Sequence, residues 1–153
     1  MKRKIKKIRL TTTLALLKQH GACESGYKKL RKHLGLRWQD DKPINLLVIL
    51  KNNGVQDMLW CIRATEQSYA DHWQLMCKMY ADFAESVLPL FEKAVPGNNA
   101  PRLAIEAART ATPETAEAAE AAGAAGWAAE AAGRAAGAAE EKKQTTIIRK
   151  YLR

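Results

Sequence analysis

Two His/Cys pairs are the side chains of this sequence that could bind a metal ion. His20 and Cys23 stand three residues apart, a spacing found among zinc ligands, and His72 and Cys77 would supply a second pair. The second pair is five residues apart on a segment predicted to be helical, so its two side chains point away from each other. We therefore expect all four to be core or surface residues, and we expect no metal and no cofactor.

Nucleophilic catalysis needs a Cys or Ser with a base positioned beside it. The chain has three cysteines and three histidines, but no local signature links a thiol to an imidazole. Asp40 and Asp41 are adjacent carboxylates in a predicted loop, where such residues cap helices more often than they act as an acid/base pair. The sequence contains neither a phosphate-binding loop nor a dinucleotide fingerprint. We predict that the protein is not an enzyme.

Basic side chains are unevenly distributed along the chain. Residues 1–37 hold twelve Lys or Arg and one acid, whereas residues 38–141 hold eight bases and fifteen acids. Such a basic head attracts nucleic acid, an acidic protein surface or an anionic membrane, and charge alone does not choose among them. The candidate binding residues belong to a basic arm, a basic helix and the loop after it: Lys2, Arg3, Lys4, Lys6, Lys7, Arg9, Lys28, Lys29, Arg31, Lys32, Arg37 and Trp38.

Several interpretations of these basic segments stay open. The arm, residues 1–10, interleaves its bases with Ile5, Ile8 and Leu10. It is a disordered solubilising tail, a nucleic-acid-binding arm whose affinity falls with salt, or an amphipathic strand or helix that docks on the body. The basic helix is either a solvated face or a surface that contacts anions or nucleic acid.

Local signals predict the elements that position the basic helix. Three consecutive threonines can cap a short helix that ends at Gly21. The basic helix follows, with Tyr27, Leu30 and Leu34 on one face, and ends at Gly35.

The next segment predicts a loop and a helical hairpin. Residues 37–41 form the loop, in which Asp41 can cap the following helix. The wholly apolar run 44–50 suits a buried strand or a buried helix, and the start signals and the Asn-Asn-Gly turn after it favour a helix. Residues 43–64 therefore predict an αα-hairpin.

The best-defined amphipathic helix begins at residue 69. An aromatic stripe at helical spacing indicates a core-facing helix, and its members are Tyr69, Trp73, Met76, Tyr80, Phe83, Val87 and Phe91. Pro89 predicts a kink or a helix end near residues 87–88, because proline removes a backbone donor and crowds the preceding turn. A loop follows at residues 96–99.

Residues 102–139 are about half alanine, interrupted by four glycines and by Trp127. Because alanine has the highest helix propensity, we predict a helix over residues 113–139. Its small residues repeat with a heptad, which permits close approach of a second helix in the same molecule or in a homodimer. The alternative is a solvated low-complexity helix.

The length of this helix implies a break. Unbroken to residue 152, it would span roughly 60 Å at 1.5 Å per residue. A compact domain of this size has a diameter of about 40 Å. The predicted break points are residues 123–126 and 145–146. Residues 140–153 are predicted to be helical, with a strand at 145–148 that pairs with residues 5–10 as the alternative.

Several segments carry a resemblance to a known family. They are GACESGY at residues 21–27, LWCIRAT at 59–65, VLPLFE at 87–92, PRLAIEAA at 101–108, and the alanine repeat. In order and spacing, residues 12–152 resemble the alanine-rich immunity proteins encoded beside toxin genes in bacterial polymorphic toxin loci. The resemblance implies a helical protein that neutralises a partner protein by binding it, without catalytic residues.

Two features depart from that family. The basic arm lies outside its pattern, and an immunity protein against a nuclease is usually acidic, whereas this chain has a formal net charge of +9. A phage or mobile-element protein that uses the same scaffold to block a host defence factor, or to contact nucleic acid, is therefore a further interpretation.

Taken together, the sequence predicts an all-α fold. A basic arm at residues 1–10 precedes a single-domain helical bundle at 11–153, with an aromatic-rich core half at 11–96 and an Ala-rich helical half at 101–153. We expect a non-catalytic inhibitor that binds a toxin or defence factor with an acidic surface; the alternative is a nucleic-acid-binding accessory protein. The odd cysteine number, the absence of a signal-peptide pattern and the absence of a membrane-spanning stretch predict a cytoplasmic protein.

Overall fold

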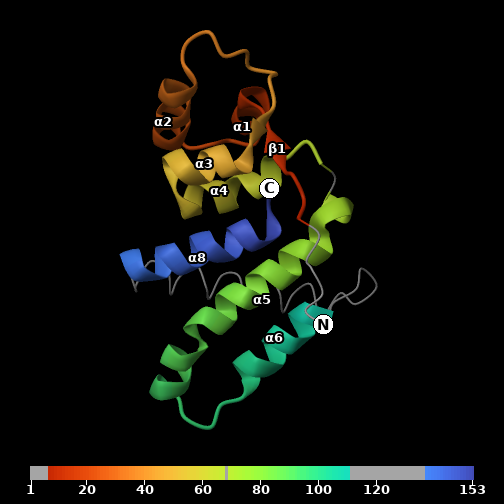
Figure 1. Cartoon of the computed structure of the whole chain (residues 1–153), viewed down its shortest axis with the longest axis vertical. Helices are drawn as coiled ribbons and strands as arrows, with labels where there is room; N and C mark the ends of the chain where they lie inside the picture. The colour runs from red at the N-terminus through yellow and green to blue at the C-terminus, as the bar shows by residue number, and fades with distance from the viewer. Residues whose placement is uncertain (1–6, 68, 111–136) are drawn as a thin grey trace. The chain divides into compact units, whose positions relative to one another are not determined.

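The computed structural model describes residues 7–67, 69–110 and 137–153 (Figure 1). The all-α prediction is confirmed, because these residues form seven α-helices and a sheet of only two short strands. In chain order the elements are β1 (Thr11–Thr12), α1 (Leu14–Gln19), α2 (Glu24–Leu34), β2 (Ile44–Asn45), α3 (Leu46–Asn53), α4 (Val55–Cys61), the 3-10 helix η1 (Ile62–Ala64), α5 (Tyr69–Ala94), α6 (Ala100–Thr110) and α8 (Ala138–Tyr151).

Several predictions fall outside the described residues. These are residues 113–136 of the alanine-rich helix predicted over 113–139, the seam of that helix for a second helix or a homodimer, and the break at 123–126. Four bases of the arm, Lys2, Arg3, Lys4 and Lys6, fall outside as well. Among the helices that the structure describes, none has the length and apolar character needed to cross a lipid bilayer.

The chain divides into two compact units. Unit 1 comprises Met1–Ser68 and Leu152–Arg153, and unit 2 comprises Tyr69–Tyr151. Unit 1 has sixteen Lys or Arg against five Asp or Glu, a formal charge of +11, while unit 2 has nine against eleven, a charge of −2. The basic character of the protein therefore belongs to unit 1. The single-domain arrangement stays a prediction.

The first helices of unit 1 follow their predicted caps. The Oγ1 atom of Thr13 accepts a hydrogen bond from the Leu16 backbone N–H at 3.1 Å, which begins α1. The chain leaves α1 through Gly21, whose φ is +76°. Helix α2 buries Leu30 and packs against α3, and it ends at Gly35 as predicted.

The two strands were not predicted. Thr11 pairs with Asn45 and Thr12 with Ile44 in an antiparallel register. The Ile44 and Asn45 backbones are consequently extended, and the predicted hairpin begins only at Leu46. The prediction that Asp41 caps this helix is wrong, because the Oδ1 atom of Asn45 accepts the cap hydrogen bond from Leu47 N–H at 2.9 Å.

Residues 7–10, the part of the basic arm that the structure describes, pack within unit 1. Ile8 forms a parallel bridge with Leu152, and the Arg153 N–H donates to the Ile8 carbonyl at 2.9 Å. Leu10 is 1% exposed, and its carbonyl accepts from Leu46 N–H at 3.0 Å. Of the three interpretations of the arm, docking on the body therefore holds for residues 7–10.

Unit 2 is built on the long helix α5, which lies antiparallel to α6 and also contacts α8 (Figure 1). Trp73, Cys77 and Leu88 of α5 form an apolar cluster with Ile105 and Ala108 of α6. The alternative that the helix ends before Pro89 is wrong, since α5 continues to Ala94. Proline removes one backbone hydrogen bond, and the buried residues that precede it keep the helix packed on α6.

Helix α8 corrects two predictions about the end of the chain. Thr145 and Thr146 lie inside the uninterrupted helix, so the predicted break there and the alternative strand at 145–148 are both wrong. The backbone instead turns at Gly137, whose φ of +70° suits a residue without Cβ. Glu140 of α8 is buried, and its Oε1 atom accepts a 2.6 Å hydrogen bond from Ser86 of α5.

Candidate functional site

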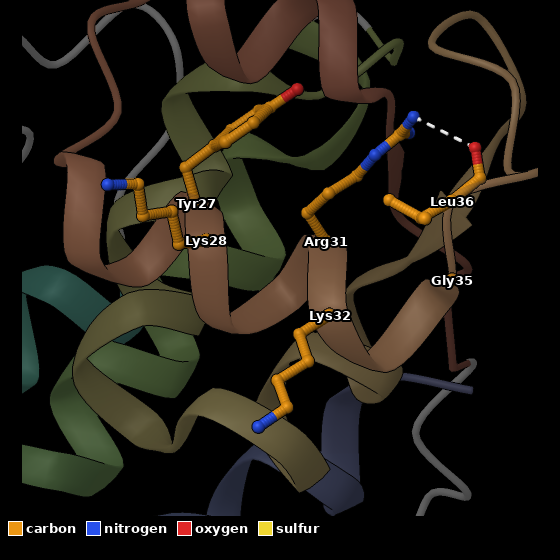
Figure 2. Close-up of a pocket in the computed structure, with 6 residues that line it drawn as sticks. All are labelled: Tyr27, Lys28, Arg31, Lys32, Gly35 and Leu36. Carbon is orange, nitrogen blue, oxygen red and sulfur yellow. Dashed lines mark hydrogen bonds between the residues drawn. The ribbon is translucent and has the colours of Figure 1, made fainter.

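A pocket lies beside the predicted basic helix. Its volume is about 350 Å³, and it is lined by Tyr27, Lys28, Arg31, Lys32, Gly35 and Leu36. Figure 2 shows the first four projecting from α2 and Leu36 in the segment that follows. Spacings of one, four and five residues from Tyr27 place the helical members on one side of α2. Most of the exposed lining is carbon.

The local sequence explains why α2 presents this surface. Glu24 stands in its first turn, and Arg31, Lys32 and His33 stand in its last, an arrangement that complements the helix dipole. Gly35 then adopts φ 85° and ψ 159°, a conformation that is essentially limited to glycine. A Cβ built on Gly35 would meet no atom within 4 Å, so the backbone angle, not crowding, requires glycine.

The Arg31 guanidinium is held within the chain. Its Nη1 atom donates to the Trp38 carbonyl at 2.7 Å and lies 3.2 Å from Asp40 Oδ1, while Nη2 donates to the Leu36 carbonyl at 3.3 Å. The last of these bonds is the dashed line in Figure 2. Arg31 therefore shapes the loop after α2, and its aliphatic stem contributes to the pocket.

The two lysines of the pocket reach solvent. Lys28 is 73% exposed and pairs with Glu24 one turn earlier in the helix. Lys32 is exposed and forms no ion pair with the described residues. An exposed pair such as that of Lys28 contributes about 0–1 kcal/mol, so a ligand carboxylate can replace Glu24 at little cost.

The loop after α2 adds two large side chains. Leu36 is 90% exposed although its backbone is tied to Arg31. Trp38 is half-buried, with the Lys42 ammonium 4.1 Å from its ring centroid, and its Nε1 atom is buried without a hydrogen-bond partner among the described residues. Trp38 was among the predicted binding residues, but Leu36 was not, and its only signal in the sequence is that of an apolar residue directly after a helix-ending glycine.

Lys18 of α1 is a second residue that sequence reasoning missed. Its Nζ atom lies 5.2 Å from the centroid of the Tyr27 ring and 3.4 Å from Asp40 Oδ2. The interaction with Tyr27, followed by that with Asp40, raises the pKa of the Lys18 ammonium. Lys18 and Tyr27 lie on different helices, so no local pattern could have paired them.

The other predicted binding residues do not line the pocket. Lys29 and Arg37 are exposed, as are Lys7 and Arg9 in the docked segment at residues 7–10. Lys2, Arg3, Lys4 and Lys6 lie outside the described residues. The structure thus brings together Lys28, Arg31 and Lys32 from the predicted set and adds Tyr27 and Leu36 to them.

Two of the three cysteine thiols lie in buried environments that disfavour the reactive thiolate. Cys61 and Cys77 are buried, and Cys23 is exposed. Burial, and secondarily the Asp57 carboxylate, raises the pKa of Cys61 to about 12, and burial also raises the pKa of Cys77. Both buried thiols therefore stay protonated at neutral pH and are poor nucleophiles. Within residues 7–67, 69–110 and 137–153, no three His, Cys, Asp or Glu side chains gather to hold a metal ion.

A cluster of ionisable side chains in unit 2 joins three helices. Asp82 of α5 accepts hydrogen bonds from Tyr151 and Lys150 of α8 and from Arg109 of α6, at 2.7, 2.5 and 3.0 Å. Burial raises the pKa of Asp82, but these hydrogen bonds outweigh burial and lower it. Burial, with the Asp82 hydrogen bond, raises the pKa of Tyr151. Neither group changes protonation near neutral pH, so the cluster is suited to holding helices together.

Comparison with family models, with curated proteins and with solved structures finds no match to this chain.

Proposed function

We propose that this protein is a non-catalytic inhibitor that acts in the cytoplasm and neutralises a partner protein by stoichiometric binding. The observation that carries the proposal is the α2 pocket, which combines a carbon-rich lining, an exposed Leu36 and the ammonium groups of Lys28 and Lys32. Protein interfaces combine an apolar centre with a polar rim in this way. The +11 charge of unit 1 predicts an acidic partner surface, since complementary charge accelerates and orients association.

A protein partner suits this surface better than nucleic acid does. Phosphate contacts rely on available cations, and arginine is the side chain best suited to them. The one arginine of the pocket, Arg31, already donates to the loop, and the exposed area of Leu36 gains nothing from a phosphate. An acidic protein surface supplies both carboxylates and apolar side chains.

The sequence resemblance, together with this surface, supports an immunity or anti-defence role for the inhibitor. In that role the partner is a toxin encoded next to this protein or, for a phage-encoded inhibitor, a host defence factor. The immunity role predicts a toxin gene beside the gene of this protein, and the decisive experiment expresses that toxin with and without this chain. We expect the chain to restore growth and to form a stable complex of fixed stoichiometry by size-exclusion chromatography with light scattering. Unrestored growth together with recovery of nucleic acid alone would contradict the proposal.

Nucleic-acid binding is the second candidate, because residues 1–37 hold twelve bases against one acid. This function predicts binding of a labelled duplex or single strand that weakens steeply with salt. Fluorescence anisotropy from about 50 to 200 mM NaCl measures that slope. The absence of any anisotropy change at the lowest salt would eliminate this candidate.

A further inference from the structure

We infer that the α2 pocket recognises a partner segment in which one large apolar side chain is flanked by carboxylates. The inference rests on the proposed function and specifies its partner. Three features of the pocket support it: the lining, the fixed position of Leu36 and the spacing of the two lysines.

The lining favours an apolar group. The pocket volume of about 350 Å³ is many times the roughly 10–15 Å³ that a cavity needs to hold one water molecule, which leaves room for a large side chain. Tyr27 contributes a ring, and the lysine and arginine side chains contribute their methylene stems, so few lining atoms can hydrogen-bond water. Replacement of such poorly held water by an apolar group favours binding.

The backbone at Leu36 is preorganised by hydrogen bonds within the chain. The Gly35 N–H donates to the Arg31 carbonyl at 3.0 Å, and the Arg31 guanidinium donates to the Leu36 carbonyl. The backbone on both sides of the leucine Cα is therefore anchored, while its side chain is 90% exposed. A backbone held in this way loses little conformational freedom on binding.

The lysines determine which groups flank the apolar anchor. Lys28 and Lys32 are four residues apart on α2 and both line the pocket. A carboxylate on the partner segment would pair with Lys32, which forms no ion pair with the described residues, and a second would compete with Glu24 for Lys28. Because Arg31 is engaged with the loop, the pocket offers single-point ammonium contacts and no two-pronged guanidinium contact.

The test uses the full chain and three synthetic peptides. The first is acetylated and amidated Gly-Glu-Glu-Trp-Glu-Glu-Gly, the second has Ala in place of Trp, and the third has Lys in place of every Glu. Titration of ¹⁵N-labelled protein, followed by NMR, measures affinity and location together. We expect the first peptide to shift the signals of Tyr27, Lys32 and Leu36, the second to bind at least about tenfold more weakly, and the third not to bind.

Variants of the protein separate the two contributions. Leu36→Ser should weaken the first peptide at least about tenfold, and the double variant Lys28→Glu/Lys32→Glu should abolish its binding. Lys51→Glu is the matched control, because Lys51 is an exposed lysine of α3 that does not line the pocket. Its affinity for the peptide should stay within about twofold of the unchanged protein.

The outcomes distinguish this inference from the proposed function. Equal affinity for the Trp and Ala peptides, no binding of the Trp peptide, or signal shifts centred elsewhere would overturn the inference. A toxin complex that the Leu36→Ser and double-lysine variants leave unchanged would also overturn it, while the inhibitor function would stand. If the pocket binds the first peptide but no protein complex or growth rescue is found, the inhibitor function fails and the recognition chemistry of the pocket stands.

Discussion

Replacement of Asp82 by Asn tests the electrostatic account of unit 2. The carboxylate is 13% exposed and connects α5 to α6 and α8 through Arg109, Lys150 and Tyr151. Asparagine keeps nearly the same shape, but it removes the negative charge and replaces one of the two acceptor oxygens by an amide donor. The variant therefore weakens the polar contacts of residue 82 with little change in packing.

The expected magnitude follows from the exposure of the partners. Lys150 is 49% exposed and Arg109 is 37% exposed, so each ion pair is screened and contributes about 0.2–1 kcal/mol. The Tyr151 side chain is buried, and its hydroxyl donates to a charged acceptor, a bond of about 1.5–3 kcal/mol that Asn weakens but does not remove. We expect Asp82→Asn to cost about 1–2 kcal/mol of unfolding free energy. A chain of this length then melts about 2–8 °C lower.

The pH dependence gives an independent check. Because the pKa of Asp82 is lowered in the folded protein, its stabilisation is complete above the unfolded value of about 3.9 and is lost as pH falls through the folded value. The difference in melting temperature between the unchanged protein and Asp82→Asn should therefore be largest near neutral pH and should narrow below about pH 4. Circular dichroism at 222 nm, recorded during thermal unfolding at several pH values, measures this difference.

Glu85→Gln is the matched control. Glu85 also pairs with Arg109, and that hydrogen bond lowers its pKa, but its side chain is 56% exposed. We expect a loss below about 1 kcal/mol. Equal losses for the two variants, or a difference that stays constant on acidification, would refute the assignment of the charge effect to Asp82.

Three further predictions concern other parts of the chain. Gly54 joins α3 to α4 at φ 98° and ψ −179°, so Gly54→Ala should lower the free energy of unfolding in urea by about 1–3 kcal/mol. Gln56→Ala, on the exposed face of α4, is the control and should change this free energy by less than about 0.5 kcal/mol. Equal effects of the two substitutions would contradict the backbone argument. Cys23 should react with a thiol reagent in the folded protein while the two buried thiols react only after unfolding, and rapid reaction of all three would contradict their burial. Leu36→Ala should leave the unfolding free energy within about 0.5 kcal/mol because the side chain is 90% exposed, and a larger loss would show that Leu36 packs within the fold.

The sequence was enough to predict the helix that carries the candidate site, but not the contacts that its side chains make. Helix α2, its basic residues and its end at Gly35 follow from periodicity, composition and a glycine signal. The different roles of these basic residues do not follow from the sequence. Arg31 and Lys28 have similar sequence surroundings, but only Arg31 donates to three acceptors in the following loop. The path of the loop after α2 therefore decides which basic side chain is free to contact a ligand.

The sequence by itself determined the all-α class, the cap at Thr13, the amphipathic helix α5 and the concentration of bases near the start. These features arise from interactions among residues a few positions apart, namely side-chain caps and the 3.6-residue period, or from composition alone.

Only the tertiary structure decided the pairing of Ile8 with Leu152, the displacement of the helix start from Asp41 to Asn45, and the joining of Asp82 to Tyr151. Each depends on residues brought together from distant parts of the chain. The free energy of such a contact comes from burial and desolvation at the meeting point, and no local pattern of residues records where that point lies.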